Sequence, residues 1–153
     1  MQPIANLAKL SPMPNRNLLG SFDGLKQASI LPGAVFIGPW EDVDHDKFIV
    51  IAGITHDKVL ACTVLINSRI NPYIMRRQKM LDCQVYVKSE DYDFLSHDSF
   101  VNCAQPMIGT TAHFVGDEYK YCGLLNEQDL ALVRHSIVES GLLTDEEIAN
   151  FNL

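Results

Sequence analysis

Two long apolar segments between residues 47 and 67 predict an antiparallel pair of buried strands. The first, KFIVIAGIT at 47–55, is nearly continuous and rich in β-branched side chains, which is typical of a strand covered on both faces. A short polar break, HDK, separates it from VLACTVLIN at 59–67, so the two segments form a hairpin. The NPY that follows ends the second strand, because Pro72 has no amide hydrogen to donate to a ladder.

Other strands are shorter and less apolar. AVFIG at 34–38 follows Gly33, and CQVYVK at 83–88 alternates between small apolar and larger polar side chains. DSFVNCA at 98–104 alternates in the same way, which indicates strands with one face buried. TTAHFV at 110–115 is a weaker candidate for a sixth strand.

The chain after residue 125 changes to a helical period. One apolar stripe, spaced three or four residues apart, consists of Leu130, Val133 and Ile137. Asn126 is placed to cap the start of this helix and Gly141 to end it. Thr144 and Glu147 have the spacing of a capping box, which predicts a last short helix.

These elements predict an α+β fold. We expect a small, strongly bent antiparallel sheet or an SH3-like barrel of five to six strands, followed by two C-terminal helices. Strong bending or closure removes exposed strand edges and buries both strands of the apolar hairpin. The length of 153 residues suits one domain, at 32–153. Residues 1–31 show no sustained period, so we expect an extended or partly ordered N-terminal arm.

Composition narrows the class of protein. The chain is 47% hydrophobic and 20% charged, as in ordinary globular proteins. No apolar run reaches the about 18 residues that span a bilayer, and the first residues lack the features of a secretion signal. We therefore expect a cytoplasmic protein with no membrane partner.

Cysteine spacing and missing motifs exclude further classes. The four cysteines are widely spaced and include no C-x-x-C pair, so we expect reduced thiols and no metal or other cofactor. The segment DVDHDK resembles the start of a calcium loop, but Lys47 occupies the position that requires glycine. There is no Gly-rich phosphate loop, nucleophile elbow or H-E-x-x-H motif.

The charge distribution is uneven. The net charge of −7 counts against a nucleic-acid-binding protein. However, Arg69, Arg76, Arg77 and Lys79 fall within eleven positions, beside Tyr73. Arginines that pair with phosphate and an aromatic ring that stacks on a base suit single-stranded RNA, although such a loop is also common on ordinary surfaces.

Two histidines precede strands and could transfer protons near neutral pH. His45 lies between carboxylates before the first hairpin strand, and Ser68 follows the end of the second. His97 comes just before the strand that begins near Ser99. Each histidine segment also reads as a polar turn without chemical function.

The segments HDKFIVIAG, VLACTVLINS, LDCQVYV and FLSHDSFVNCA, in this order, resemble the PemK/MazF-like toxin group of small SH3-like barrels. More closely, they resemble small uncharacterised bacterial proteins related to that group. The resemblance covers about residues 32 to 139 and implies metal-independent cleavage of single-stranded RNA. It also implies partners: the RNA, an antitoxin or another protein, and a second copy in a homodimer.

The resemblance assigns roles to particular residues. Ser68 matches the position at which the group holds phosphate, and Gly33 matches the glycine that opens its first strand. Where the group has arginine, usually before proline, this chain has His45, Asp46 and Lys47. The resemblance thus implies His45, His97 and Ser68 as catalytic residues.

The RNA would then be bound by Arg69, Arg76, Arg77 and Tyr73. The function that the resemblance implies is that of a toxin-type endoribonuclease. The alternative, favoured by the acidic net charge and the missing arginine, is a non-catalytic protein-interaction module on the same framework. A phage- or plasmid-borne accessory protein that binds a host factor is a third hypothesis.

Overall fold

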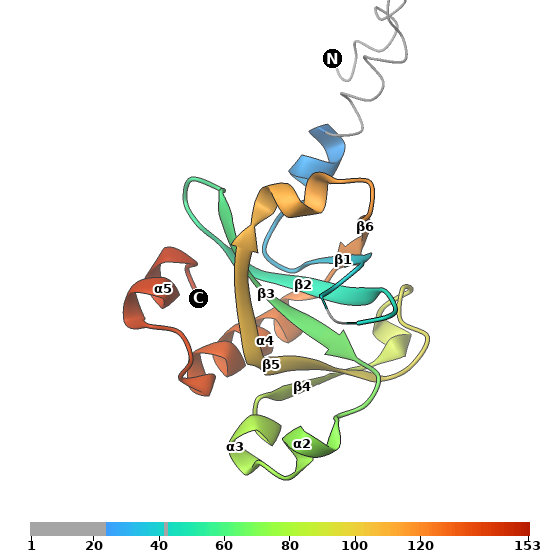
Figure 1. Ribbon diagram of the computed structural model, residues 1–153, viewed down its shortest axis with the longest axis vertical. Coiled ribbons are helices and arrows are strands. Elements are labelled where there is room, and N and C mark those ends of the chain that lie inside the picture. Colours follow the sequence, from blue (N-terminus) through green and yellow to red (C-terminus); the bar gives the residue numbers. More distant parts are fainter. Residues whose placement is uncertain (1–23, 42) are drawn as a thin grey trace, which may run out of the picture.

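A computed structural model describes residues 24–41 and 43–153. Six strands form one antiparallel sheet in the order β4-β5-β3-β2-β1-β6 (Figure 1). The strands are β1 (Ala34–Gly38), β2 (Lys47–Ile54), β3 (Leu60–Asn67), β4 (Gln84–Val87), β5 (Ser99–Thr110) and β6 (Lys120–Leu124). The helices are α2 (Pro72–Met75), α3 (Gln78–Leu81), α4 (Glu127–Ser140) and α5 (Asp145–Asn150), with 3-10 turns η2 (Ser89–Asp91) and η3 (Thr111–Val115).

The predicted α+β class is confirmed, with two helices at the C-terminal end of the chain. The sheet is strongly bent, because β5 turns sharply along its length and its register on β3 shifts between Thr63 and Leu65 (Figure 1). The sheet remains open within the described part of the chain, since β4 and β6 form its two edges. No helix among the described residues has the length and apolar character needed to cross a membrane.

The position of the sixth strand was predicted wrongly. Thr110 ends β5 and the rest of TTAHFV forms η3, while the sixth strand is β6. The backbone amide of Thr111 donates to Val59 O at 2.8 Å, which turns the chain across the end of the hairpin. Gly123, with φ +151, lies where the register of β6 on β1 shifts, and a glycine at such a bulge hides a strand from pattern analysis.

The basic segment is more ordered than the predicted loop. Asn71 caps α2 by accepting a hydrogen bond from the Ile74 amide at 2.9 Å, and Pro72 takes the first helical position. β3 ends at Asn67, before the proline, and Pro72 starts a helix instead of ending the strand.

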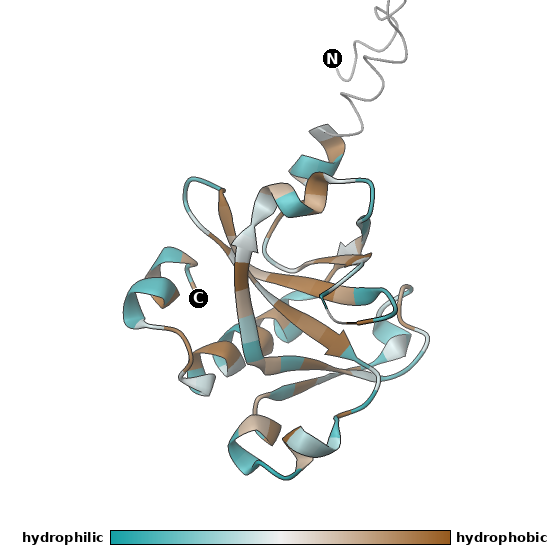
Figure 2. Cartoon of the chain, viewed as in Figure 1, coloured by the Kyte–Doolittle hydropathy of each residue, from teal (hydrophilic) through white to brown (hydrophobic). Residues whose placement is uncertain are grey.

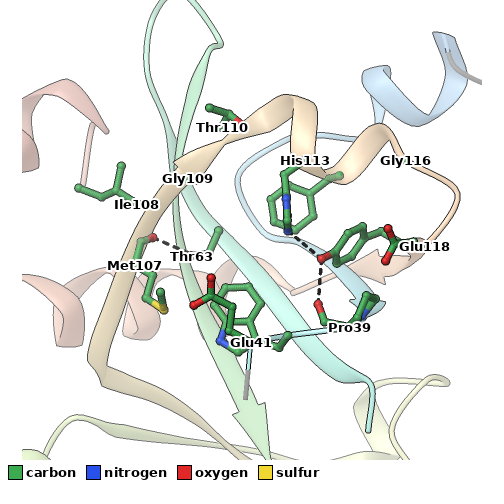
Figure 3. A pocket seen from close by; sticks show the side chains of 13 residues that line it. Pro39, Glu41, Thr63, Met107, Ile108, Gly109, Thr110, His113, Gly116 and Glu118 are labelled. Carbon is green, nitrogen blue, oxygen red and sulfur yellow. Dashed lines mark hydrogen bonds between the residues drawn. The ribbon is translucent and has the colours of Figure 1, made fainter. Parts of the chain in front are cut away.

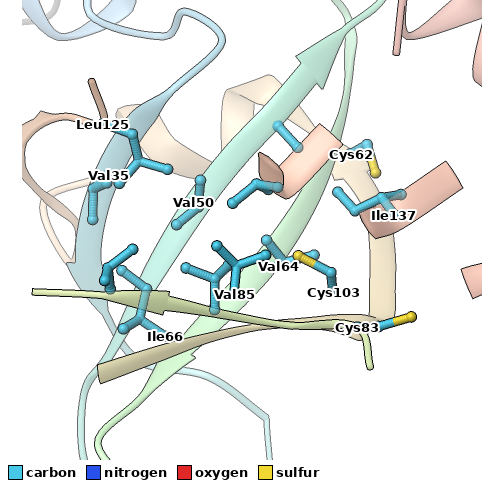
Figure 4. Close-up of a cluster of buried hydrophobic side chains, with 14 of the residues drawn as sticks. Val35, Val50, Cys62, Val64, Ile66, Cys83, Val85, Cys103, Leu125 and Ile137 are labelled. Carbon is cyan, nitrogen blue, oxygen red and sulfur yellow. The ribbon is translucent and has the colours of Figure 1, made fainter. Parts of the chain in front are cut away.

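Both faces of the sheet are buried, which explains why the β2 sequence is almost continuously apolar (Figure 2). Val50 and Ala52 face one core cluster, against which α4 packs Val133 and Ile137 (Figure 4 shows part of it). The residues between them alternate to the other face. That second cluster includes Phe36, Ile49, Ile51, Phe114 and Tyr119.

The predicted helix ends are confirmed. Asn126 Oδ1 accepts from the Asp129 amide at 2.7 Å, and Gly141 adopts the left-handed conformation with φ +72. Thr144 and Glu147 form both hydrogen bonds of a capping box.

All four cysteines are free, and Cys62, Cys83 and Cys103 are buried. Burial raises the pKa of the Cys62 thiol to about 11, so it stays protonated at neutral pH.

The N-terminal arm is described only from residue 24. Residues 24–28 are helical and Ile30 is buried in the second core cluster. Residues 1–23 lie outside the described residues.

Substitution of Gly53 tests how α5 packs on the sheet. A Cβ on Gly53 would lie 2.5 Å from Phe151 O and 3.0 Å from Phe151 Cβ. We expect Gly53→Ala to lower the free energy of unfolding by about 1–3 kcal/mol in urea denaturation. The control is Gly109→Ala in β5, where a Cβ would meet no atom within 4 Å. Equal stability of the two variants would show that α5 does not restrict this site.

Candidate functional site

The sheet order brings three predicted site residues to one edge. The loop before β2 carries His45, Ser68 follows the end of β3, and the loop before β5 carries His97. Because β5, β3 and β2 are antiparallel neighbours, these strand ends meet on the same side, at the right in Figure 1. All three residues line a cleft of about 170 Å³, called the edge cleft here. The other polar residues in its lining are Asp46, Lys47, Ser96 and Ser99.

His45 is oriented by its neighbour. Its Nδ1 lies 3.0 Å from Asp44 Oδ1, and the two side chains are 67% and 99% exposed. A carboxylate only accepts hydrogen bonds, so Nδ1 carries the hydrogen and Nε2 of the neutral ring can accept a proton. The hydrogen bond from His45 also lowers the pKa of Asp44, which keeps that carboxylate charged.

His97 lies in a loop that its neighbours hold in place. Asp98 accepts hydrogen bonds from the Tyr86 hydroxyl at 2.7 Å, the Ser89 amide at 2.9 Å and the Ser89 hydroxyl at 3.1 Å. These bonds, the Ser89 amide foremost, lower the pKa of Asp98. Ser99 Oγ donates to the backbone carbonyl of His97 at 2.7 Å. The backbone under the imidazole is therefore anchored to β4 and η2.

Lys47 is a site residue that sequence reasoning missed. It is the first residue of β2, lines the edge cleft and donates a hydrogen bond from Nζ to Asn67 Oδ1. Burial lowers the pKa of this half-buried ammonium group. The available signal was its place at the start of an apolar strand whose hairpin partner ends at Asn67. From the sequence alone, Lys47 was interpreted as part of a polar turn.

The predicted RNA-binding residues do not line the edge cleft. Arg69 follows Ser68 directly, whereas Tyr73 and Arg76 belong to α2 and its C-terminal cap, near the bottom of Figure 1. The guanidinium of Arg77 lies 3.5 Å from the centroid of the Tyr73 ring, and its Nη1 donates to Tyr73 O at 2.9 Å. One face of the ring is therefore already stacked on a cation.

The edge cleft combines groups with complementary chemistry. Two imidazoles can accept and donate protons, while an ammonium group and a hydroxyl can stabilise an oxyanion or bind phosphate. Within the described residues, no group of three or more His, Cys, Asp or Glu side chains is arranged to hold a metal ion.

Comparisons with known proteins found distant similarity to solved structures. No family model matches the sequence, and no curated protein matches it. Among solved structures, the Mycobacterium tuberculosis toxin MazF-mt6 is similar over 72% of this chain and 98% of its own, with 12% identity and a TM-score of 0.46. By its name, MazF-mt6 belongs to the toxin group that the sequence motifs resemble.

Proposed function

We propose that the protein is a metal-independent endoribonuclease of toxin type that cleaves single-stranded RNA. The observation that supports this proposal is the edge cleft, where His45, Lys47, Ser68 and His97 meet. Cleavage by the ribose 2′-hydroxyl needs a base, an acid and a group that stabilises the pentavalent phosphate. The edge cleft offers candidates for all three roles.

The two histidines share the proton transfers. His45 Nε2 accepts the proton of the 2′-hydroxyl as the 2′ oxygen bonds to phosphorus. His97 donates a proton to the 5′ oxygen as the bond between phosphorus and that oxygen breaks. The products are a 2′,3′-cyclic phosphate and a free 5′-hydroxyl, so atoms and charges balance. Lys47 and Ser68 stabilise the negative charge on the phosphate oxygens.

The basic segment binds the RNA outside the cleft. Arg69 leads from Ser68 towards α2, where Arg76 and Arg77 are exposed and can contact backbone phosphates. Tyr73 is 51% exposed, and a base can stack on the Arg77–Tyr73 pair. RNA would thus run from the catalytic groups along the chain that connects β3 to α2.

The direct test is cleavage of end-labelled single-stranded RNA by purified protein in EDTA. We expect products with a cyclic or 3′-phosphate end, and loss of this activity in His45→Ala and His97→Ala. The control is His135→Ala, which changes an exposed histidine on α4. Absence of cleavage at every ionic strength, or unchanged cleavage by both cleft variants, would rule the proposal out.

The second candidate function is a non-catalytic protein-interaction module, which the net charge of −7 favours. Its partner would be an antitoxin, another protein or a second copy of the chain. In this case His45→Ala and His97→Ala leave the effect of the protein in cells unchanged, while substitutions of exposed apolar residues abolish it.

A further inference from the structure

One hollow of the described structure lies away from the edge cleft and shares no lining residue with it. It has a volume of about 560 Å³ and opens beside the second core cluster, between the segment after β1, the C-terminal half of β5 and η3 (Figure 3). We call it the η3 hollow. Pockets for small organic ligands have volumes of about 300–1,000 Å³, so this hollow has a suitable size. The lining residues that matter most here are Trp40, Glu41, Met107, Ile108, His113 and Glu118.

One wall of the η3 hollow is preformed. The Tyr119 hydroxyl donates to Pro39 O at 2.8 Å and therefore accepts from His113 Nε2, which lies at 2.7 Å (Figure 3). A Cβ on Gly38 would lie 2.3 Å from Tyr119 Cδ1, so only glycine lets the ring pack there. His113 and Tyr119 thus hold each other in place, and the wall is present before any ligand binds.

The charge that the η3 hollow offers to a ligand is negative. Glu41 and Glu118 line it and are exposed, and no lysine or arginine is among its described lining residues. Burial and then the charge of Glu118 raise the pKa of the Tyr119 hydroxyl, so the field of that carboxylate reaches the preformed wall. The Thr63 hydroxyl donates to Met107 O at 3.1 Å and is already paired. An anionic ligand would therefore meet two carboxylates and no permanent cation.

Apolar side chains lie beside these charges. Met107 and Ile108 are 45% and 42% exposed, and Trp40 is half-buried. Apolar side chains in a concave surface gain free energy when a ligand covers them and removes them from water. The face of a tryptophan ring also attracts cations. The η3 hollow thus suits a molecule that combines an apolar body with a positive charge.

We propose that the η3 hollow binds a small organic cation, an amine or quaternary ammonium group carried on an aromatic or short aliphatic body. The body lies against Met107, Ile108 and Trp40, and the cation lies beside Glu41 and Glu118. A folded protein partner would need about 800 Å² of surface on each side, whereas only a few exposed side chains line this hollow. The inference goes beyond the proposed RNA cleavage, because none of these residues lines the edge cleft.

Trp40 reports on binding, because it lines the η3 hollow and is the only tryptophan in the chain. The probe is 4-phenylbutylamine, compared with 4-phenylbutanol and 4-phenylbutyrate, which carry the same apolar body with no charge and with a negative charge. Full-length protein is titrated at neutral pH, and binding is followed by Trp40 fluorescence and by calorimetry. We expect saturable binding of the amine, about fivefold weaker binding of the alcohol and no binding of the butyrate. Absence of saturable amine binding, or an affinity for the butyrate as high as for the amine, would overturn the proposal.

The double substitution Glu41→Gln with Glu118→Gln tests the charge. It keeps the size of two exposed side chains, so the protein should stay folded. We expect the affinity for the amine to fall to that for the alcohol, and the affinity for the alcohol to stay unchanged. The matched control is Glu139→Gln with Glu146→Gln, at two exposed positions on α4 and α5. If the control weakens amine binding as much, overall charge explains the result and the proposed contact is wrong.

The double substitution Met107→Ala with Ile108→Ala tests the apolar contact. We expect it to weaken binding of the amine and of the alcohol alike, each by about fivefold, because less apolar surface is covered. The matched control is Leu132→Ala with Leu142→Ala, which truncates side chains that are 47% and 62% exposed elsewhere on the molecule. Unchanged binding in Met107→Ala with Ile108→Ala would place the probe outside the η3 hollow and contradict the proposal.

Protein concentration distinguishes a small ligand from a second copy of the chain. Without a probe, Trp40 emission should be the same in concentrated samples and in samples that sedimentation shows to be monomeric. A shift to shorter wavelength as dimers form, with loss of amine binding in parallel, would place another chain in the hollow and overturn the proposal. None of these readouts uses RNA, so their failure and the failure of the proposed nuclease activity are separate results.

Discussion

For the proposed endoribonuclease activity, we expect Lys47→Ala to reduce the rate constant of RNA cleavage by about 10²–10³-fold, a loss typical of removing one preorganised group that stabilises a developing charge. Lys47 is the cation among the residues that line the edge cleft, and its hydrogen bond to Asn67 holds the ammonium group there. The measurement is single-turnover cleavage of a short single-stranded RNA. The control is Lys120→Ala, an exposed lysine of the edge strand β6, which should keep the wild-type rate.

The pH dependence identifies what Lys47 contributes. Burial lowers its pKa, so the proposed cleavage by the wild-type protein should slow on the alkaline side at a lower pH than an exposed lysine would allow. Lys47→Arg keeps a positive charge throughout this range, and we expect it to retain cleavage there. An arginine variant as inactive as Lys47→Ala at every pH would show that positive charge alone is not the contribution of Lys47.

The second large effect concerns stability. Ile137→Ala should lower the free energy of unfolding by about 2–5 kcal/mol, because it leaves a cavity in a close-packed core. Ile137 is fully buried where α4 packs against the sheet. Urea unfolding followed by circular dichroism measures the change.

The matched control is Leu132→Ala on the same helix. Leu132 is 47% exposed, so its truncation should cost less than about 1 kcal/mol. Alanine has the highest helix propensity, so a loss in Ile137→Ala cannot come from weakening the helix itself. Similar losses in both variants would mean that α4 is not packed on the sheet through the face that carries Ile137.

Predictions from short-range patterns were mostly correct. The caps at Asn126 and Thr144 depend on side chains that bond to amides three residues away, so the sequence contains the complete interaction. The apolar hairpin was recognisable because both faces of β2 are covered. The prediction of a strand at TTAHFV was wrong because the turn there depends on a contact with Val59, far away in the chain.

The candidate site was predicted in part. His45, Ser68 and His97 were each recognisable as polar residues at strand ends, and the structure places them in one cleft. Lys47 was missed because its partner, Asn67, is twenty residues away. The basic residues were expected around the same site, but α2 and α3 keep Tyr73 and the Arg76–Arg77 pair outside the cleft lining.

Local sequence thus specified the two C-terminal helices, the central hairpin and the chemical character of the residues at the strand ends. Tertiary contacts set the bend of β5 and the pairing of Ala34 with Leu124 on the neighbouring strands β1 and β6, and they leave a hollow of about 560 Å³ beside η3. The physical reason is the range of the interactions. A cap or an alternating strand is stabilised by neighbours within a few residues, whereas strand order and cavities depend on which distant segments bury the most apolar surface together.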